Sequence, residues 1–387
     1  MIRRTVRRGR RGRTGKSPVR RIAVLTGGGD APGLNAVIYS VVHRARQAYG
    51  WEVVGSEDGF EGLIQPPRNH KVVELTTQGV KDIVHRGGSV LGCSNVANTW
   101  AYPVEKRGIR RYVDMSRSML RNIRRHGIDA MVLVGGDGTM SMALKLCAMG
   151  VPCVGVPKTI DNDLAGTDCT FGFDTARDHA TWAIDALHTT AHAHDRVMIA
   201  EVMGRHAGWI ALHTGIAGRA DVILIPEIPY DVERVVRKMR SMGGRYSSYG
   251  LIVVAEGAHP KGGSISVTKA AGKQVDGIVG HQAKLGGAGD VLRGLLEHRV
   301  NHDVRVTVLG HIQRGGSPTP FDRLLALRFG TAAVDLVAAG KYGRMVALRT
   351  PHIVDVAIDD VVGRPHLVDP GGDLVEVARA LGIELGG

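Results

Sequence analysis

The sequence is poor in aromatic residues, in cysteine and in long apolar runs. Phe, Trp and Tyr make up 4% of the 387 residues, and no apolar run approaches the ~20 residues that a membrane-spanning helix needs. The four cysteines show neither CxxC nor metal-ligand spacing; they are Cys93, Cys147, Cys153 and Cys169. We therefore expect a soluble, cytoplasmic protein with reduced thiols and no contact with a membrane.

Acidic residues are absent from the first 21 positions. These positions hold nine Arg and one Lys, and subtracting these ten from the 50 basic residues leaves 40, against 37 acidic residues in the rest of the chain. Such a composition cannot bury apolar area, and it predicts a disordered basic tail over residues 1–19. Several alternatives stay open for residues 1–21: binding to nucleic acid or to another acidic surface, a transit peptide, a solvated extension without a function, and a start codon placed too far upstream.

Apolar segments of strand length alternate with helical patterns through the rest of the chain. The expected later strands are Val197–Val202, Val222–Ile225, Leu251–Glu256, Val304–Leu309 and Met345–Leu348. The expected helices are Asp174–Thr190, Gly208–Ala217, Val232–Met242, Gly280–Leu296 and Pro320–Ala339. This alternation predicts an α/β fold with parallel-rich sheets and helices on both faces, and the length suggests about two domains.

Two of the expected strands lead into a glycine-rich loop and then into a helix. Arg20–Thr26 precedes the loop GGGDAPG, and Ala130–Val134 precedes GGDGT. Glycines let the backbone approach a ligand closely, and the amides at a helix start face an anion, so both loops are typical of phosphate binding. Neither loop matches the P-loop or dinucleotide-binding patterns. Asp137, within GGDGT, is a natural partner for magnesium.

The segment GVPKTIDND, at residues 155–163, follows the expected buried strand Pro152–Val156. It brings Lys158, Thr159, Asp161 and Asp163 to the end of that strand, where open α/β sheets place their chemistry. The same letters are also ordinary turn composition. The segment is therefore a candidate catalytic loop.

These three segments together resemble the phosphofructokinase family. Further motifs match in the same order: FGFDTA at 171–176, HDRVMIAEVMGRHAGWIA at 194–211, PE at 226–227, AEGA at 255–258, RVTVLGHIQRGGSP at 305–318 and FDR at 321–323. The resemblance runs from about Arg20 to Arg364. It implies two Rossmann-like three-layer α/β/α domains, a nucleotide-binding one (20–172 plus 314–363) and a sugar-phosphate-binding one (173–313 plus 364–387), in a homotetramer.

The resemblance implies magnesium-dependent phosphoryl transfer from ATP to the 1-hydroxyl of fructose 6-phosphate, giving fructose 1,6-bisphosphate and ADP in glycolysis. Asp161 corresponds to the catalytic base, Thr159 to a group that hydrogen-bonds the transferring phosphoryl, and Arg205 to the residue that stabilises its charge. The positions that match sugar-phosphate contacts are Thr159, Ile160, Asp161, Arg196, Met203, Gly204, Arg205, Glu256, Arg305, His311, Ile312, Gln313 and Arg314. In the family, the equivalents of Arg196 and Arg305 reach in from the neighbouring subunit.

The positions that match nucleotide contacts are Gly29, Phe60, Gly136, Asp137, Gly138 and Thr139, with Asp137 also the metal-linked carboxylate. Two of the matched positions bear on the phosphoryl donor. Pyrophosphate-using members carry Asp in place of Gly138, where it crowds the α-phosphate of ATP, so Gly138 favours ATP. Lys158 favours pyrophosphate, because those members have Lys there to neutralise the departing phosphate. We weigh the steric clash above the charge and expect ATP, with the pyrophosphate-dependent enzyme as the alternative.

One position departs from the family pattern. Asn95 stands where the family has an arginine that bridges the phosphates of the two substrates. Loss of one transition-state cation can lower the rate by ~10²–10³. A third alternative is therefore a weakly active or inactive regulatory paralogue with a nucleic-acid-binding tail.

Overall fold

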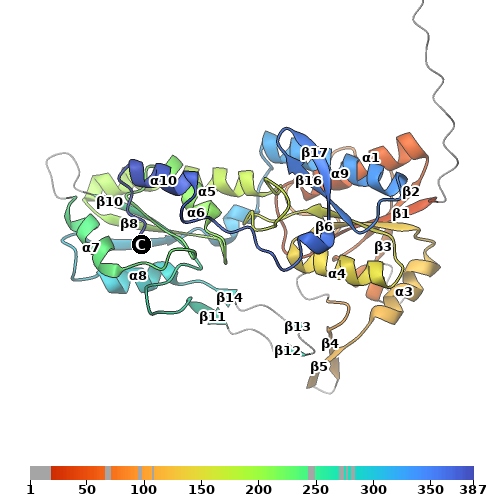
Figure 1. Ribbon diagram of the computed structural model, residues 1–387, viewed down its shortest axis with the longest axis horizontal. Coiled ribbons are helices and arrows are strands. Elements are labelled where there is room, and N and C mark those ends of the chain that lie inside the picture. Colours follow the sequence, from red (N-terminus) through yellow and green to blue (C-terminus); the bar gives the residue numbers. More distant parts are fainter. Residues whose placement is uncertain are drawn as a thin grey trace, which may run out of the picture.

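The computed structural model describes residues 19–387 except 66–70, 95–97, 107–108, 243–248, 270–273, 276–277 and 280–283. The predictions for the basic tail before residue 19 and for Asn95 lie outside the described residues. Figure 1 shows two α/β units side by side along the long axis of the molecule, each built around its own sheet. This arrangement confirms the predicted α/β class.

The first unit is built on a seven-stranded sheet with the order β17-β16-β7-β6-β1-β2-β3. Its strands are β1 (Arg21–Thr26), β2 (Glu52–Ser56), β3 (Val72–Leu75), β6 (Ala130–Gly135), β7 (Cys153–Pro157), β16 (Arg344–Arg349) and β17 (His352–Ala357). The inner strands pair in parallel, whereas β3 and β17 run antiparallel at the two edges. All six residues of β6 are buried, as expected for a strand with helices on both faces.

Two hydrophobic cores cover the two faces of this sheet. One core contains residues of α1 (Leu34–Arg44) and α9 (Pro320–Ala338), and the other contains residues of α2 (Glu61–Ile64), α3 (Ser116–Arg125) and α4 (Asp137–Ala148). A π-helical turn, Ala45–Tyr49, extends α1. A hairpin that the sequence did not predict, β4 (Tyr102–Lys106) with β5 (Ile109–Val113), lies beside α3.

The second unit is built on a four-stranded parallel sheet with the order β15-β8-β10-β9. Its strands are β8 (Val197–Val202), β9 (Val222–Leu224), β10 (Gly250–Ala255) and β15 (Val304–Val308). Figure 1 shows α5 (Phe173–His194), α6 (Trp209–Ala217) and α10 (Asp373–Ala380) on one face, with α7 (Val232–Arg240) and α8 (Ala288–Leu296) on the other. The remaining elements are two short ladders, β11 (Val267–Lys269) with β14 (Lys284–Leu285) and β12 (Gln274–Val275) with β13 (Ile278–Val279), and the 3₁₀ turns η3 (Gly310–Arg314) and η4 (Ile358–Asp360).

The prediction of one helix over Gly280–Leu296 is wrong. Residues 284–285 form strand β14, and α8 begins only at Ala288. Gly286 and Gly287 have φ of 138° and 89°, which interrupts a right-handed helix. The buried Glu201 carboxylate then accepts hydrogen bonds from the amides of Gly287 (3.1 Å) and Gly289 (2.8 Å) and so fixes where α8 begins.

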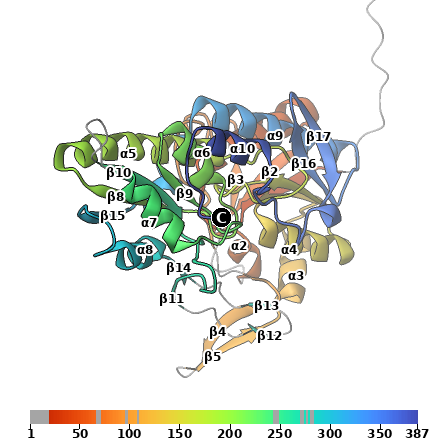
Figure 2. The same cartoon turned by 60° about the vertical axis from the view of Figure 1, so that its left-hand side comes forward.

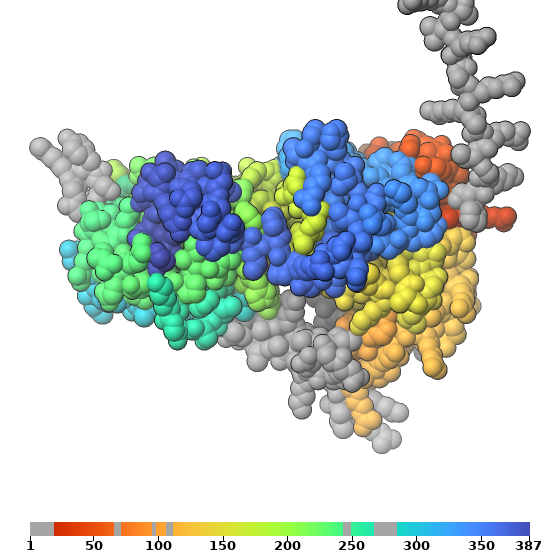
Figure 3. Space-filling model, in the orientation of Figure 1, coloured from red at the N-terminus to blue at the C-terminus, as the bar shows by residue number. Residues whose placement is uncertain are grey.

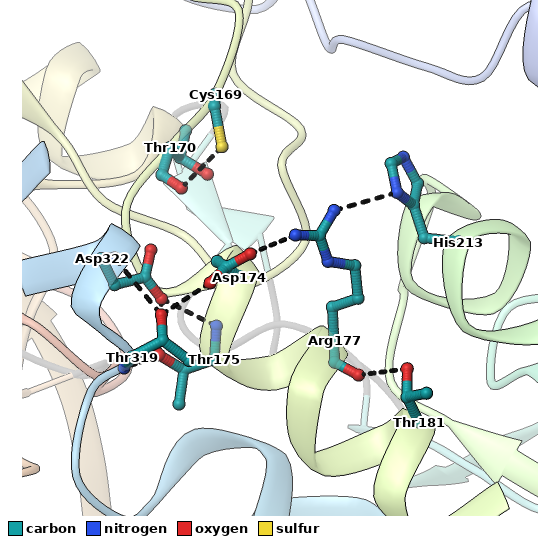
Figure 4. Close-up of polar contacts among 9 residues, drawn as sticks. All are labelled: Cys169, Thr170, Asp174, Thr175, Arg177, Thr181, His213, Thr319 and Asp322. Carbon is teal, nitrogen blue, oxygen red and sulfur yellow. Dashed lines mark hydrogen bonds and ion pairs between the residues drawn. The ribbon is translucent and has the colours of Figure 1, made fainter. Parts of the chain in front are cut away.

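A buried polar cluster joins the first turns of α5 and α9, where the two units meet (Figure 4). The Asp322 carboxylate accepts from the amide (2.8 Å) and the hydroxyl (2.6 Å) of Thr175, and the Thr319 hydroxyl donates to Asp174 (2.6 Å). Burial raises the pKa of Asp322 to about 6. The motifs FGFDTA and FDR therefore meet at this junction, where their polar side chains hold the two helices together.

The C-terminal segment after η4 runs across the front surface from the first unit to the second, as the blue residues of Figure 3 show. Pro365 forms an isolated bridge with Leu164, and the Val368 amide donates to Glu227 (2.9 Å). Both units therefore contain parts of the chain's C-terminal third, namely α9 with β16 and β17 in the first unit and α10 in the second. The exact domain boundaries stay predictions.

Candidate active site

The loop that follows β7 carries Asp161 and is held in shape by its own side chains. Asn162 adopts a left-handed conformation (φ 52°), and its buried Oδ1 accepts from the Thr170 amide at 2.9 Å. The Thr159 hydroxyl accepts from the Asp161 amide at 3.1 Å. Ile160 is fully buried in the core of the second unit, so only its backbone is left for a ligand.

Asp161 is the most strongly perturbed carboxylate of this loop. Its Oδ1 atom is buried and accepts no hydrogen bond from the described residues. Burial, and after it the negative charge of Asp163, raises the pKa of Asp161 to about 7, although Arg314 and Arg205 act in the opposite direction. A carboxylate with a pKa near neutrality is well matched to accepting a proton from a hydroxyl group.

Residues from the second sheet surround this carboxylate. Arg205 lies in the loop after β8, Glu256 directly follows β10, and Arg314 ends η3. Burial raises the pKa of Glu256, whereas Arg205 and Arg314 lower it, so both cations lie within electrostatic reach of both carboxylates. The structure thus brings together residues that are distant in sequence, as parallel strands do at their carboxyl ends.

The backbone around Met203 and Gly204 is fixed by a buried side chain. Gln313, which is fully buried, accepts from the Met203 amide at 3.3 Å and donates to the Gly310 carbonyl at 3.1 Å. Gly204 has a φ of 133°, and a Cβ there would lie 2.9 Å from the Ala207 carbonyl oxygen. Gln313 therefore positions the loop, and its side chain is not open to a substrate.

Lys158 is buried at the end of β7, with 4% of its surface exposed. Its ammonium group donates to the Gly29 carbonyl in the glycine loop after β1, and Arg314 donates to the neighbouring Asp30 carbonyl at 3.1 Å. Burial lowers the pKa of Lys158 to about 8. The side chain therefore links two loops and stays mostly cationic at neutral pH.

The loop after β6 is much more open. Gly136 precedes α4, Asp137 and Gly138 are exposed, and Thr139 is buried beneath them. A Cβ placed on Gly138 would meet no atom within 4 Å. Oδ1 of Asp137 accepts a hydrogen bond from the Gly363 amide at 2.8 Å. A loop that starts a helix and leaves backbone accessible fits a polyphosphate.

The exposed Asp137 side chain also fits magnesium. Mg²⁺ prefers carboxylate and phosphate oxygens, and proteins usually hold it by one or two carboxylates together with a substrate's phosphates. In the part of the chain that the structure describes, no group of three or more His, Cys, Asp or Glu side chains is arranged to hold a metal ion. A metal at this loop would therefore depend on ligand oxygens in addition to Asp137.

The structure also gives the positions of three further predicted site residues, Phe60, His311 and Ile312. Phe60 is 1% exposed and packs in the core between the first sheet and α3. Its ring has no open face on which adenine could stack, so the prediction that Phe60 contacts the nucleotide is wrong. His311 and Ile312 are exposed on η3. The Ile312 carbonyl contacts Nδ1 of His179, on α5, at 3.2 Å.

Arg196 and Arg305 lie at the opposite end of the second sheet. Arg196 directly precedes β8 and Arg305 is the second residue of β15, and both pair with Asp303, at 3.2 and 2.8 Å. Met203 and Arg205 lie at the carboxyl end of β8, six or more residues away along an extended strand that rises ~3.3 Å per residue. Within one chain, Arg196 and Arg305 therefore do not join the cluster around Asp161.

Sequence reasoning missed the C-terminal segment at His366. The His366 amide donates to the Asp163 carbonyl at 2.8 Å, and its Nδ1 atom contacts the Asn162 carbonyl at 3.0 Å. On its other side, the ring lies 4.8 Å from that of Trp209, whose indole N–H donates to the His366 carbonyl at 2.8 Å. The segment thus ties the Asp161 loop to the start of α6, and no local pattern marks it.

Comparison with known proteins agrees with this geometry. The family model described as Phosphofructokinase matches residues 21–337. An ATP-dependent 6-phosphofructokinase of Chloroflexus aggregans is 50% identical over 375 residues, 96% of this chain and 99% of that protein. A pyrophosphate–fructose 6-phosphate 1-phosphotransferase of Streptomyces coelicolor is 49% identical over 352 residues, which are 90% of this chain and 96% of that protein.

Solved structures resemble most of the chain as well. The phosphofructokinase of Saccharomyces cerevisiae superimposes with a TM-score of 0.72 at 28% identity, covering 88% of this chain and 45% of that longer chain. In the part of the chain that the structure describes, no helix has the length and apolar character that crossing a membrane requires. The family match, the relatives at about half identity and the shared fold lead to one conclusion: the chain belongs to the phosphofructokinase family.

Proposed function

We propose that the protein is an ATP-dependent 6-phosphofructokinase of glycolysis, which transfers the terminal phosphoryl group of ATP to the 1-hydroxyl of fructose 6-phosphate in the cytoplasm. The observation that carries this proposal is Asp161, a buried carboxylate with a pKa raised to about 7 that is subject to the charges of Asp163, Arg205 and Arg314. Phosphoryl transfer needs positioning and charge stabilisation more than covalent chemistry.

The roles that we propose for the residues around Asp161 are those that the resemblance to the family implies. Its carboxylate accepts the proton of the attacking hydroxyl, and Arg205 stabilises the charge that builds up on the transferring phosphoryl group. Thr159 hydrogen-bonds that group, and Met203 and Glu256 contact the sugar. Arg314 and His311 bind the 6-phosphate; the planar fork of arginine engages two phosphate oxygens at once.

We propose that the 6-phosphate site is completed by a second copy of the chain. Arg196 and Arg305 lie far from Asp161 in their own subunit and share Asp303, so both guanidinium groups already lie side by side. A homotetramer in which these two arginines reach a neighbour's site accounts for their position. Asp303 would then hold the pair in place until the sugar phosphate binds.

The donor side is formed by Gly29, Gly136, Asp137, Gly138 and Thr139. When bound, Mg²⁺ supplies charge neutralisation between the donor phosphates, and Asp137 is the side chain that would hold it. Gly138 leaves room for the α-phosphate of ATP, since no atom lies within 4 Å of the position of an added Cβ. The relative from Chloroflexus aggregans, named for ATP, and the relative from Streptomyces coelicolor, named for pyrophosphate, are 50% and 49% identical to this chain. Identity therefore does not decide the donor, and the choice of ATP rests on the open space at Gly138.

The test is a direct assay of the purified chain with magnesium, fructose 6-phosphate and either ATP or pyrophosphate. We expect fructose 1,6-bisphosphate with ATP at a far higher rate than with pyrophosphate. A preference for pyrophosphate would support the alternative donor, and the buried Lys158 would then neutralise the departing phosphate. No product with either donor would support the inactive paralogue, for which Asn95 is the sequence argument.

A further inference from the structure

Residues 363–368, which we call the strap, cross from the first unit to the second. Val361, two residues before the strap, is buried in a core of the first unit, and Val368, its last residue, is buried in the core of the second unit. Figures 1 and 2 show that the chain after β16 and β17 continues into α10, which lies beside α6. The strap is therefore anchored at both ends in hydrophobic cores, one in each unit.

The strap forms hydrogen bonds with two loops of the first unit that carry proposed site residues. Gly363, its first residue, donates its amide to the Asp137 carboxylate in the loop after β6 at 2.8 Å. His366 donates its amide to the Asp163 carbonyl in the loop after β7, also at 2.8 Å. The strap therefore contacts both the loop proposed to bind the phosphoryl donor and the loop proposed to carry the catalytic base.

Glu227 joins the strap to the loop that carries Arg205. This side chain lies shortly after β9 and is half-buried. Its carboxylate accepts the Val368 amide at 2.9 Å, and it accepts the Gly208 amide at 2.9 Å through one oxygen and at 3.1 Å through the other. Gly208 comes three residues after Arg205 and immediately before α6. One carboxylate therefore holds the last residue of the strap and the end of the Arg205 loop together.

The surroundings of Glu227 suit a carboxylate that acts as a hydrogen-bond acceptor. Glu227 forms no ion pair with a residue that the structure describes. Burial raises its pKa, whereas the amides of Gly208 and Val368 act in the opposite direction. A Cβ on Gly208 would lie 2.8 Å from Oε2 of Glu227 and 2.4 Å from Cβ of Ile225, so only glycine allows this close approach. Positions 208 and 227 are therefore matched to each other.

We infer that Glu227 is a positioning residue, which anchors the strap and thereby fixes the Arg205 loop relative to the loop that carries Asp161. The inference rests on the function proposed above, in which Arg205 stabilises the transferring phosphoryl group and Asp161 accepts the proton. These two residues come from different units, so their spacing depends on contacts between the units. The strap supplies such contacts, and loss of its anchor should therefore disturb the geometry that the reaction needs.

The competing interpretation is that Glu227 only stabilises the start of α6. Asp231 has such a role at the start of α7, where its carboxylate accepts the Glu233 amide at 2.9 Å. Among the described residues, no hydrogen bond joins the Asp231 carboxylate to the strap. Asp231→Asn is therefore a matched control, because it weakens the capping of a helix in the same unit and leaves the strap in place.

The experiment measures turnover and the state of the strap in the same full-length proteins. The variants are Glu227→Gln, His366→Phe, both together, and the Asp231→Asn control. Glutamine has the shape of glutamate but a single acceptor oxygen, and its NH₂ group would face an amide donor. Each protein is assayed with magnesium, fructose 6-phosphate and ATP. If Glu227→Gln does not fold, Glu227→Asp, which keeps the charge but withdraws it from the two amides, takes its place.

Fluorine NMR of protein labelled with fluorotryptophan reports on the strap without any need for activity. The indole N–H of Trp209 donates to the His366 carbonyl at 2.8 Å, so its resonance depends on where the strap lies. The chain has four Trp residues, and a Trp209→Phe variant identifies the resonance that belongs to Trp209. The other three resonances are internal controls for the fold.

We expect Glu227→Gln to lower kcat roughly 10-fold and to leave both KM values within about 3-fold, because small misplacements of reacting groups act mainly on the transition state. The Trp209 resonance should shift while the other three stay. The double variant should be less than ~3-fold slower than the slower single variant, since Glu227 and His366 act through the same strap. Asp231→Asn should lower the melting temperature and leave kcat and the Trp209 resonance unchanged.

Three results would overturn the inference. An unchanged Trp209 resonance in Glu227→Gln would mean that Glu227 does not hold the strap, whether or not the protein is a phosphofructokinase. A shifted resonance with an unchanged kcat would mean that the strap does not position the site. Fully multiplicative effects of Glu227→Gln and His366→Phe would mean that the two residues act separately. Failure of the proposed function is distinct, because it shows as the absence of product with either donor in the unchanged protein.

Discussion

The loops after β6 and β7 leave neighbouring parallel strands, yet the protein holds them very differently. After β6, Asp137 and Gly138 are exposed, and the space over Gly138 is open. After β7, Lys158 is buried, Asp161 has a buried carboxylate oxygen, and the pKa of each is shifted to between about 7 and 8. The difference suggests that the β6 loop is completed by its ligand, whereas the β7 loop is organised before any ligand arrives, as electrostatic catalysis requires.

The largest expected effect comes from the preorganised loop. Asp161→Ser should lower kcat by ~10²–10⁴-fold, the range for loss of a general base, with a smaller effect on the KM for fructose 6-phosphate. Steady-state kinetics with ATP and magnesium measures both constants. The control is Asp178→Ser, an exposed carboxylate on α5. A turnover close to that of the unchanged protein would remove Asp161 from its proposed role.

Substitutions in the open loop after β6 should change the use of the phosphoryl donor and little else. Gly138→Asp should weaken the use of ATP by roughly 10²-fold, because placing like charges together costs several kcal/mol. Since the position is open, the free protein should lose little stability. Gly138→Ala adds a methyl group without a charge and should cost much less. The comparison fails if Gly138→Asp lowers the melting temperature strongly or leaves kcat/KM for ATP unchanged.

The C-terminal segment offers a way to loosen the β7 loop without touching its carboxylates. His366→Phe keeps a ring beside Trp209 but loses the contact of Nδ1 with the Asn162 carbonyl. Loss of a hydrogen bond worth ~1 kcal/mol should lower kcat by roughly 5- to 10-fold while KM stays nearly constant. His352→Phe, at an exposed position in β17, is the control. An equal change in both variants would argue against a role of His366 in positioning the loop.

The smallest effect concerns pH. Asp161 must be ionised to accept a proton, and its pKa is raised to about 7, so kcat/KM for fructose 6-phosphate should fall as the pH drops through about 7. Asp163→Asn removes the second cause of that shift but leaves the burial, and it should move the inflection to lower pH. A pH–rate profile of both proteins measures the change. An inflection near 4 in the unchanged protein would mean that burial does not perturb Asp161.

Much of the fold was predictable because its signals are local. The buried strands of both sheets read as continuous apolar runs, and the glycine loops mark where two strands of the first sheet turn into helices. The start of α8 was not predictable, since it depends on hydrogen bonds from the amides of Gly287 and Gly289 to Glu201, which lies 86 and 88 positions away in the sequence. Phe60 was misassigned for the same reason: its sequence neighbours do not reveal whether its ring faces a core or a cleft.

By itself, the sequence determined which chemical groups the protein has and which strand each one follows, since these depend on residue type and on short-range patterns. The tertiary structure decided what those groups can do. Burial between two units raises the pKa of Asp161, and His366, 204 positions from Asn162, holds the loop that carries it. Electrostatic shifts and long-range hydrogen bonds depend on distances in space, which no local pattern encodes.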